Sequence, residues 1–254
     1  MSLFTLKGKV AVVTGGNGGI GLGMAEGMAG LGATIVIAGR NAEKSKAAAA
    51  QLAKLGVKTG VVAVNVAEAE SCKAMIASVI EQFGRLDILV NNAGINIRKQ
   101  PEDYTPAEWR EVLAINLDGA FYCCHAAYPE MKRAGGGKII NTGSMMSIFG
   151  TSFASAYAAS KGGIVQMTRA LACAWAKDNI QVNAILPGWI DTELTQAARR
   201  QVDGLHDRVL ARTPAARWGA PADFRGIAAF LASPASDFVT GTAIPVDGGF
   251  SVQG

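Results

Sequence analysis

Tyr157 and Lys161 are the residues of this sequence whose types and spacing best fit catalysis. Residues four apart lie on the same face of an α-helix, so the phenol and the ammonium group can point the same way. A phenol has an ordinary pKa of about 10, and a nearby cation lowers it by favouring the phenolate. The pair therefore predicts a tyrosine that exchanges a proton with an alcohol or ketone oxygen. Many ordinary amphipathic helices share this spacing, so the interpretation depends on the other motifs of the chain.

A second candidate is the glycine-rich segment 14–21 (TGGNGGIG), which follows a short β-branched run and precedes a helical pattern at 22–31. Glycines allow a backbone to approach a pyrophosphate, and the N-terminus of a helix offers free N–H groups and a positive dipole end. The spacing of Gly15, Gly19 and Gly21 differs from the common GxGxxG pattern. Its position between the first strand and the first helix nevertheless predicts a dinucleotide-binding loop.

The residue after the second expected strand should decide which dinucleotide is preferred. An acidic side chain there binds the free 2′-hydroxyl of NAD, whereas this chain has Arg40 between Gly39 and Asn41. A guanidinium group can hold a phosphate by its charge and by its planar geometry. The sequence thus favours NADP(H) over NAD(H). The alternative is that Arg40 is a solvated surface charge and that either cofactor is accepted.

Short apolar runs alternate along the chain with longer segments rich in Ala, Lys, Glu and Gln. The runs are continuous, as in strands that are covered on both faces. This alternation predicts an α/β fold, a Rossmann-like doubly wound parallel sheet of about seven strands, in a single domain at 1–254. The segment 188–225 has no strand pattern and is predicted to be a lid, with an ordinary surface loop as the alternative. The expected strands are 9–13, 34–38, 61–64, 86–90, 138–140, 181–186 and 242–246.

Composition excludes several classes of function. The net charge is only +4 and no basic stripe with interleaved aromatic residues occurs, so nucleic-acid binding is not expected. No apolar run is long enough to cross a membrane and no secretory leader is visible, which predicts a cytoplasmic protein. The spacing of Cys72, Cys123, Cys124 and Cys173 is not that of a metal site. We expect no metal and expect these cysteines to be buried free thiols.

Together these motifs resemble those of the short-chain dehydrogenase/reductase family over nearly the whole chain. The segment 14–21 is similar to the TGxxxGxG cofactor loop of the family, and 91–94 is similar to its NNAG motif. Ser144 stands before Tyr157 at the family's serine-to-tyrosine spacing, and the segment 187–192 resembles the part that holds the nicotinamide carboxamide. Members are usually tetramers or dimers, so the resemblance implies a homotetramer or a homodimer.

The resemblance also implies a role for each candidate residue. Tyr157 would be the general acid in ketone reduction and the base in alcohol oxidation, and Ser144 would hold the carbonyl oxygen. Lys161 would lower the pKa of Tyr157 and bond the nicotinamide ribose, and Asn116 would bind a water that links Lys161 to solvent. The implied cofactor-binding residues are Gly15, Asn17, Gly19, Ile20, Gly21, Arg40, Asn65, Val66, Asn92, Ala93, Gly94, Tyr157, Lys161, Pro187, Gly188, Ile190 and Thr192.

Two positions depart from the pattern of the family. The family often has an acid where Asn65 stands, and that acid contacts the adenine amine. Members that use NADP(H) often carry Lys or Arg immediately before the second motif glycine, where this chain has Gly18. From sequence, the preference for NADP(H) therefore depends on Arg40 alone.

The segments 92–98, 138–146 and 214–219 look most like the gluconate and 2-deoxygluconate dehydrogenase-type members. The resemblance thus implies an NAD(P)(H)-dependent oxidoreductase that interconverts a secondary alcohol and a ketone on a sugar acid or polyol-like small molecule. The candidate substrate residues are Arg98, Ser144, Met146, Tyr157 and Trp189. Two alternatives remain open: a reductase of 3-oxoacyl thioesters on acyl-carrier protein, and a catalytically silent dinucleotide-binding regulatory protein.

Overall fold

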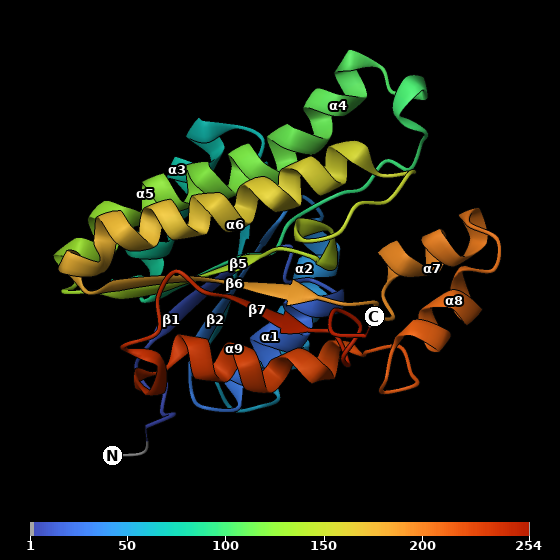
Figure 1. The fold of residues 1–254 in the computed structure, drawn as a ribbon. Helices are drawn as coiled ribbons and strands as arrows, with labels where there is room; N and C mark the ends of the chain where they lie inside the picture. The colour runs from blue at the N-terminus through green and yellow to red at the C-terminus, as the bar shows by residue number, and fades with distance from the viewer. Residues whose placement is uncertain (1–2, 254) are drawn as a thin grey trace.

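The computed structural model, which describes residues 3–253, has a central parallel sheet covered by helices on both faces (Figure 1). The seven strands lie in the order β3-β2-β1-β4-β5-β6-β7, so the predicted α/β fold is confirmed. The sheet order reverses between β1 and β4, and ligands of such sheets bind outside the carboxyl ends of the strands at this point. The strands are β1 Val10–Thr14, β2 Thr34–Gly39, β3 Thr59–Ala63, β4 Ile88–Asn91, β5 Gly137–Thr142, β6 Ile180–Pro187 and β7 Ala243–Val246.

Two hydrophobic cores lie on opposite faces of the sheet. Successive residues of a strand point to opposite faces, so Val13 enters the core with helices α1, α2 and α9, and Val12 enters the core with α3, α5 and α6. This is why the strands have continuous apolar runs. The helices are α1 Gly19–Ala29, α2 Ala42–Ala53, α3 Ala69–Phe83, α4 Pro106–Leu113, α5 Gly119–Arg133, α6 Ser155–Trp175, α7 Glu193–Gln201, α8 Leu205–Arg212 and α9 Arg225–Ala232.

Helix α1 begins at Gly19, whereas the sequence pattern predicts its start at residue 22. The predicted start is too late because three glycines lie in the first turns, and glycine disfavours a helix in isolation. Close packing explains why Gly23 is needed. A Cβ atom on Gly23 would lie 2.0 Å from the carbonyl oxygen of Pro221, in the short helical turn that precedes α9. Glycine at this position therefore brings α1 against the end of the predicted lid segment and fixes where the glycine-rich loop emerges.

We expect Gly23→Ala to lower the free energy of unfolding by about 1–3 kcal/mol, because a new Cβ must push two backbone segments apart. The matched control is Gly226→Ala in α9, where an added Cβ meets no atom within 4 Å. That change should be neutral or stabilising by up to about 1 kcal/mol, the difference in helix propensity. Urea unfolding of both variants checks this, and equal effects would contradict the close contact.

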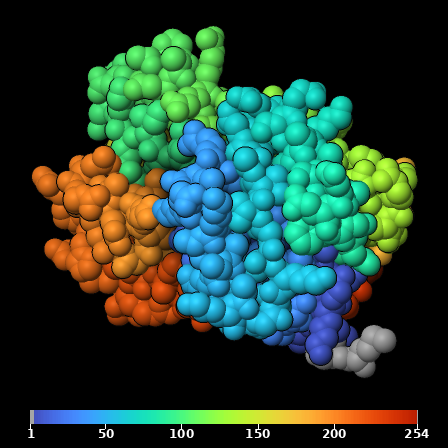
Figure 2. Space-filling view, turned by 180° about the vertical axis from the view of Figure 1, so that it is seen from behind, coloured from blue at the N-terminus to red at the C-terminus, as the bar shows by residue number. Residues whose placement is uncertain are grey.

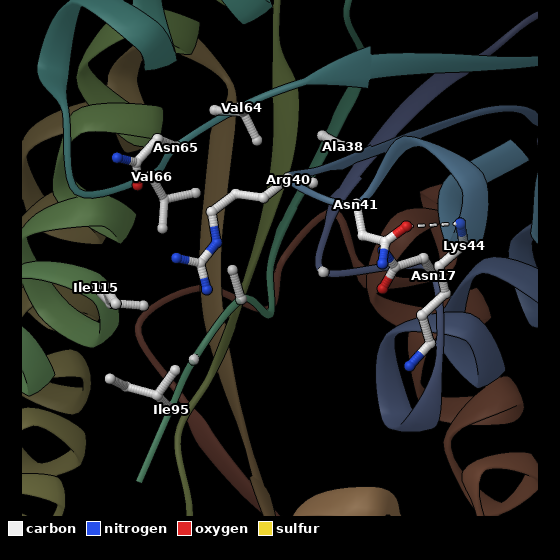
Figure 3. Close-up of a pocket in the computed structure, with 14 residues that line it drawn as sticks. Asn17, Ala38, Arg40, Asn41, Lys44, Val64, Asn65, Val66, Ile95 and Ile115 are labelled. Atoms are coloured by element: carbon white, nitrogen blue, oxygen red, sulfur yellow. Dashed lines mark hydrogen bonds between the residues drawn. The ribbon is translucent and has the colours of Figure 1, made fainter. Parts of the chain in front are cut away.

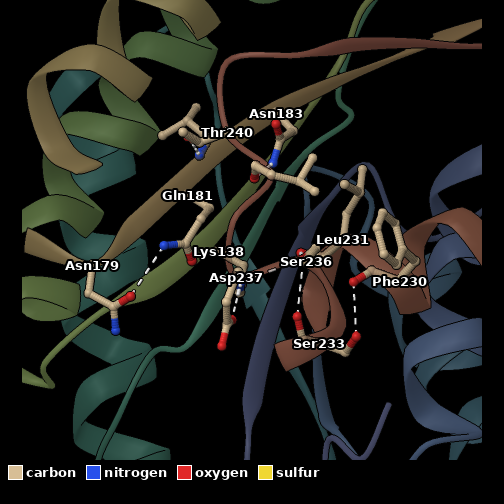
Figure 4. Close-up of polar contacts among 12 residues, drawn as sticks. Lys138, Asn179, Gln181, Asn183, Phe230, Leu231, Ser233, Ser236, Asp237 and Thr240 are labelled. Carbon is tan, nitrogen blue, oxygen red and sulfur yellow. Dashed lines mark hydrogen bonds and ion pairs between the residues drawn. The ribbon is translucent and has the colours of Figure 1, made fainter. Parts of the chain in front are cut away.

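Polar contacts tie the segment after α9 to the amino-terminal end of β5 (Figure 4). The buried Lys138 amine of β5 donates to Asp237 Oδ1 at 2.7 Å, and burial lowers the pKa of this lysine. Ser236 Oγ lies 3.0 Å from the carbonyl oxygens of Leu231 and Ser233, which fastens the segment after α9.

The cysteines depart from the prediction at one position. Cys72, Cys123 and Cys124 are buried free thiols, but Cys173 is exposed. Cys173 follows the buried Ala172 in α6, and the next residue of a helix points about 100° away, here towards solvent. Within residues 3–253, none of the helices has both the length and the apolar character required to traverse a bilayer.

Candidate active site

A first cleft of about 320 Å³ opens at the carboxyl ends of β1, β2 and β3. Figure 3 shows Arg40 reaching across it towards Val66 and Ile115, while Asn17 and Lys44 lie at the other side. Seven of its lining residues were predicted to bind the cofactor: Gly15, Asn17, Arg40, Asn65, Val66, Ala93 and Gly94. Sequence reasoning missed the others: Ala38, Gly39, Asn41, Lys44, Val64, Ile95 and Ile115.

The glycine-rich loop is held against the end of β4 by Asn92. Its amide nitrogen donates to the carbonyl oxygens of Thr14 and Gly15, at 3.1 and 3.0 Å. A Cβ atom on Gly21 would lie 2.4 Å from this nitrogen, and a Cβ on Gly15 would lie 3.0 Å from the Cα of Ala93. Only glycines allow this close arrangement. The loop therefore presents bare backbone to the first cleft, as the pyrophosphate of a dinucleotide requires.

A second cleft of about 290 Å³ shares Asn17, Lys44 and Gly94 with the first and continues to the end of β5. It brings together most of the remaining predicted residues: Gly19, Ile20, Asn92, Ser144, Tyr157, Lys161, Pro187, Gly188, Ile190 and Thr192. Gly21 lies beneath the loop and does not line it. The lining residues that the motifs did not reveal include Thr142, Gly143 and the beginning of α7. Side chains of predicted catalytic and cofactor-binding residues thus share one continuous space.

Helix α6 carries Tyr157 and Lys161 on the face that points into the second cleft. The Lys161 amine lies 5.6 Å from the centre of the Tyr157 ring and donates to the carbonyl oxygen of Thr142 at 2.6 Å. Lys161 is buried, and burial lowers its pKa from 10.5 to about 8. Because Thr142 ends β5, this bond fixes the lysine relative to the sheet.

The predicted effect of Lys161 on Tyr157 is wrong for this geometry. Burial raises the pKa of the Tyr157 phenol, and the lowering contributions come from a hydrogen bond with Ser144 and from the charge of Arg98. The lysine amine lies beside the phenol ring, but it donates its hydrogen bond to Thr142 and none to the phenol oxygen. Desolvation of the phenolate therefore outweighs the nearby charges.

The buried ammonium of Lys161 should make stability depend on pH. Its folded-state pKa of about 8 lies below the ordinary 10.5, so the unfolded chain holds the proton more tightly. The cost of burial is then fully present below pH 8 and disappears as the pH rises towards 10.5. We expect the free energy of unfolding of the native protein, relative to Lys161→Met, to increase by about 2–3 kcal/mol between about pH 7 and about pH 10. A pH-independent difference in urea unfolding would contradict this assignment.

Asn116 lies behind Lys161, in a π-helical turn at Ala114–Asp118 that joins α4 to α5. Its amide oxygen accepts the backbone N–H of Ile95 at 2.8 Å. Its amide nitrogen donates to the carbonyl oxygen of Ile95 at 2.9 Å and to Ser160 Oγ at 3.1 Å. Asn116 therefore ties the loop after β4 to α6. Helix α5 is therefore preceded by a π turn. The water-binding role of Asn116 stays a prediction.

A third, smaller cleft of about 90 Å³ adjoins Tyr157 on the side away from the glycine-rich loop. All five candidate substrate residues line it: Arg98, Ser144, Met146, Tyr157 and Trp189. Arg98 is partly buried, and its guanidinium group donates to the carbonyl oxygen of Leu194 at 3.0 Å and to Gln201 Oε1 at 3.1 Å. Burial lowers the pKa of Arg98, although a guanidinium keeps its charge at neutral pH.

The segment 188–225 contains α7 and α8. Its own small core includes Ala198, Leu205 and Val209, with Trp218 packed against the Arg199 guanidinium at 3.8 Å from the ring centre. Figure 2 shows this orange segment bordered by blue residues of α2 and by the green region around α4. Its role as a moving lid stays a prediction.

The parallel sheet, the glycine-rich turn after β1 and the cleft at the switch in strand order together define a Rossmann-like dinucleotide-binding fold. A family model described as enoyl-(acyl carrier protein) reductase matches residues 15–251. The chain is 42% identical over 252 residues to 2-dehydro-3-deoxy-D-gluconate 5-dehydrogenase of Formosa agariphila, covering 98% of this chain and 95% of that one. It is 38% identical to 5-keto-D-gluconate 5-reductase of Escherichia coli, with 98% of each chain covered.

Among solved structures, the gluconate 5-dehydrogenase of Burkholderia cenocepacia in complex with NADP and tartrate superposes with a TM-score of 0.94. That protein is 39% identical, and the match covers 99% of this chain and 98% of the other. The chain belongs to the short-chain dehydrogenase/reductase family. The resemblance that the motifs suggested, including the sugar-acid members, is therefore confirmed.

Proposed function

We propose that this protein is an NADP(H)-dependent oxidoreductase that interconverts a secondary alcohol and a ketone on a sugar acid or polyol-like molecule. The observation that carries the proposal is the position of Tyr157. It lies between the second cleft, which continues from the glycine-rich loop, and the third cleft, which contains Arg98. The names of the full-length relatives, which are dehydrogenases and reductases of gluconate derivatives, support the same class.

A bound nicotinamide dinucleotide supplies the hydride in this chemistry. The Tyr157 phenol gives its proton to the carbonyl oxygen in reduction and takes the proton from the alcohol in oxidation. Ser144, which lines both clefts together with Tyr157, donates to the same substrate oxygen and stabilises the charge that develops there. Lys161 keeps a fixed position through its bond to Thr142 and can hold a ribose hydroxyl in the second cleft.

The charges around the first cleft support NADP(H). Arg40 reaches into the cleft, and none of the described residues that line it is acidic. A 2′-phosphate is therefore attracted rather than repelled. The related structure from Burkholderia cenocepacia, which is in complex with NADP, supports the same preference.

The third cleft supports an acidic substrate. Arg98 is its only cation among the described lining residues, and a guanidinium pairs well with a carboxylate. A substrate whose ketone approaches Tyr157 could therefore place its carboxylate on Arg98. Apolar Met146 and Trp189 would cover the carbon chain between them.

The test is NADPH and NADH oxidation against keto sugar acids, the same sugars without a carboxylate, cyclic ketones and 3-oxoacyl thioesters. We expect turnover of at least one keto sugar acid with NADPH, and weak turnover of its counterpart without the carboxylate. Preference for 3-oxoacyl thioesters would favour the acyl-carrier-protein reductase alternative. Dinucleotide binding without turnover of any carbonyl compound would favour the silent regulatory protein.

We also propose a homotetramer or homodimer with a cytoplasmic location. Trp109 on α4 and Phe121 on α5 are exposed at 37% and 44%, and large apolar side chains of this kind suit a subunit contact. Sedimentation velocity of the purified protein tests the assembly, and a monomer at micromolar concentration would contradict it.

A further inference from the structure

We propose that Lys44 is the second cation that recognises the 2′-phosphate of NADP(H), and that Glu193 of the predicted lid competes with the phosphate for it. This inference rests on the proposed function, since it requires NADP(H) in the first cleft. It assigns to Lys44 the charge that is absent at Gly18 of the glycine-rich loop.

The start of α2 directs Lys44 towards the dinucleotide clefts. Asn41 caps this helix, and its side-chain oxygen accepts the backbone N–H of Lys44 at 2.9 Å, the dashed line in Figure 3. The helix therefore begins at the end of β2 with Lys44 in its first turn. As a result, the side chain lines both the first and the second cleft.

The amine of Lys44 lies beside the glycine-rich loop. A Cβ atom built on Gly18 would lie 3.5 Å from Lys44 Cε and 3.7 Å from Lys44 Nζ. The end of Lys44 therefore lies in contact with position 18. A lysine from α2 thus places a positive charge beside the loop, which has none of its own at Gly18.

Lys44 and Arg40 approach the first cleft from different sides. In Figure 3 the guanidinium of Arg40 extends towards Val66 and Ile115, whereas Lys44 lies near Asn17 on the opposite side. They are the only cations among the described residues that line this cleft. A phosphate dianion in this cleft is attracted by both charges, while a ribose hydroxyl gains little from a second cation.

Glu193 holds the amine of Lys44 in the structure, with both carboxylate oxygens at 2.8 Å. The side chains of Lys44 and Glu193 are 41% and 83% exposed, and exposed ion pairs contribute little stability. A phosphate that carries more negative charge than one carboxylate can therefore displace Glu193 at small cost. Glu193 is the first residue of α7, so this exchange links the 2′-phosphate to the predicted lid.

The experiment is a fluorescence titration of the full-length protein with NADPH and with NADH. We expect Lys44→Gln to raise the Kd for NADPH about tenfold, which is typical for one charge-assisted hydrogen bond, and to change the Kd for NADH less than about twofold. The matched control is Lys46→Gln in the same helix. Lys46 pairs with Glu43 at 2.9 Å and lines neither cleft, so both constants should stay within about twofold.

Glu193→Gln is the second variant of the experiment. It removes the carboxylate that competes for Lys44, so the Kd for NADPH should fall about two- to threefold. This gain should vanish in the Lys44→Gln background. Equal weakening of NADPH and NADH by Lys44→Gln would place the amine on the pyrophosphate and overturn the inference. Unchanged Kd values for both dinucleotides in Lys44→Gln would overturn the inference as well. If the native protein binds neither dinucleotide, the proposed function itself fails, an outcome distinct from failure of Lys44 alone.

Discussion

Replacing Tyr157 with Phe is expected to lower kcat/KM for carbonyl reduction by about a thousandfold or more while the Kd for NADPH changes less than about twofold. The substitution removes one oxygen atom and keeps the ring that lies beside Lys161. The second cleft therefore retains its shape, and the lost group is the one that Ser144 contacts. Steady-state kinetics and a fluorescence titration of the same preparation measure the two effects.

Tyr128→Phe is the matched control for this experiment. The Tyr128 hydroxyl donates to Asp178 at 2.8 Å beside Trp175, and Tyr128 lines none of the three clefts. Its removal should change kcat/KM less than about twofold, although it costs one partly buried hydrogen bond. Near-native rates in Tyr157→Phe would show that another group transfers the proton.

Arg40→Asp is expected to raise the Kd for NADPH about a hundredfold and to lower the Kd for NADH. The change removes the guanidinium that extends into the first cleft and places a carboxylate where the 2′-phosphate is proposed to bind. Loss of an attractive charge and gain of a repulsive one together amount to about 3 kcal/mol, which corresponds to about two powers of ten. The same carboxylate can accept the 2′-hydroxyl of NADH.

Arg40→Lys distinguishes charge from geometry at this position. A lysine keeps the charge but lacks the planar fork of arginine, so the Kd for NADPH should fall between those of the native protein and Arg40→Asp. Competition between the two dinucleotides measures the switch directly. If Arg40→Asp keeps its native preference for NADPH, Arg40 is a solvated charge and the cofactor assignment is wrong.

The central strands of the sheet could be predicted from sequence because they are buried on both faces. Val12 and Val13, for example, enter different cores, so neither position tolerates a polar residue. The start of α1 could not be predicted in the same way. Gly23 disfavours a helix by propensity, and only the contact with Pro221 explains why a glycine is required there.

The candidate site was predictable where backbone geometry restricts the residue type, as at Gly15 in the glycine-rich loop. Lys44 was missed because its direction depends on the Asn41 cap and on Glu193, which is distant in the sequence. The pKa of Tyr157 was predicted in the wrong direction for a related reason. Residue spacing indicates which charges are near, but the amount of water around a phenol depends on the packing of the whole site.

The division of the interior into two cores separates the two tasks of the site. The glycine-rich loop leads into α1, which packs with α2 and α9, whereas α6, which carries Tyr157 and Lys161, packs with α3 and α5 on the other side of the sheet. Cofactor choice and proton chemistry can change independently during evolution, because each is built on its own set of helices.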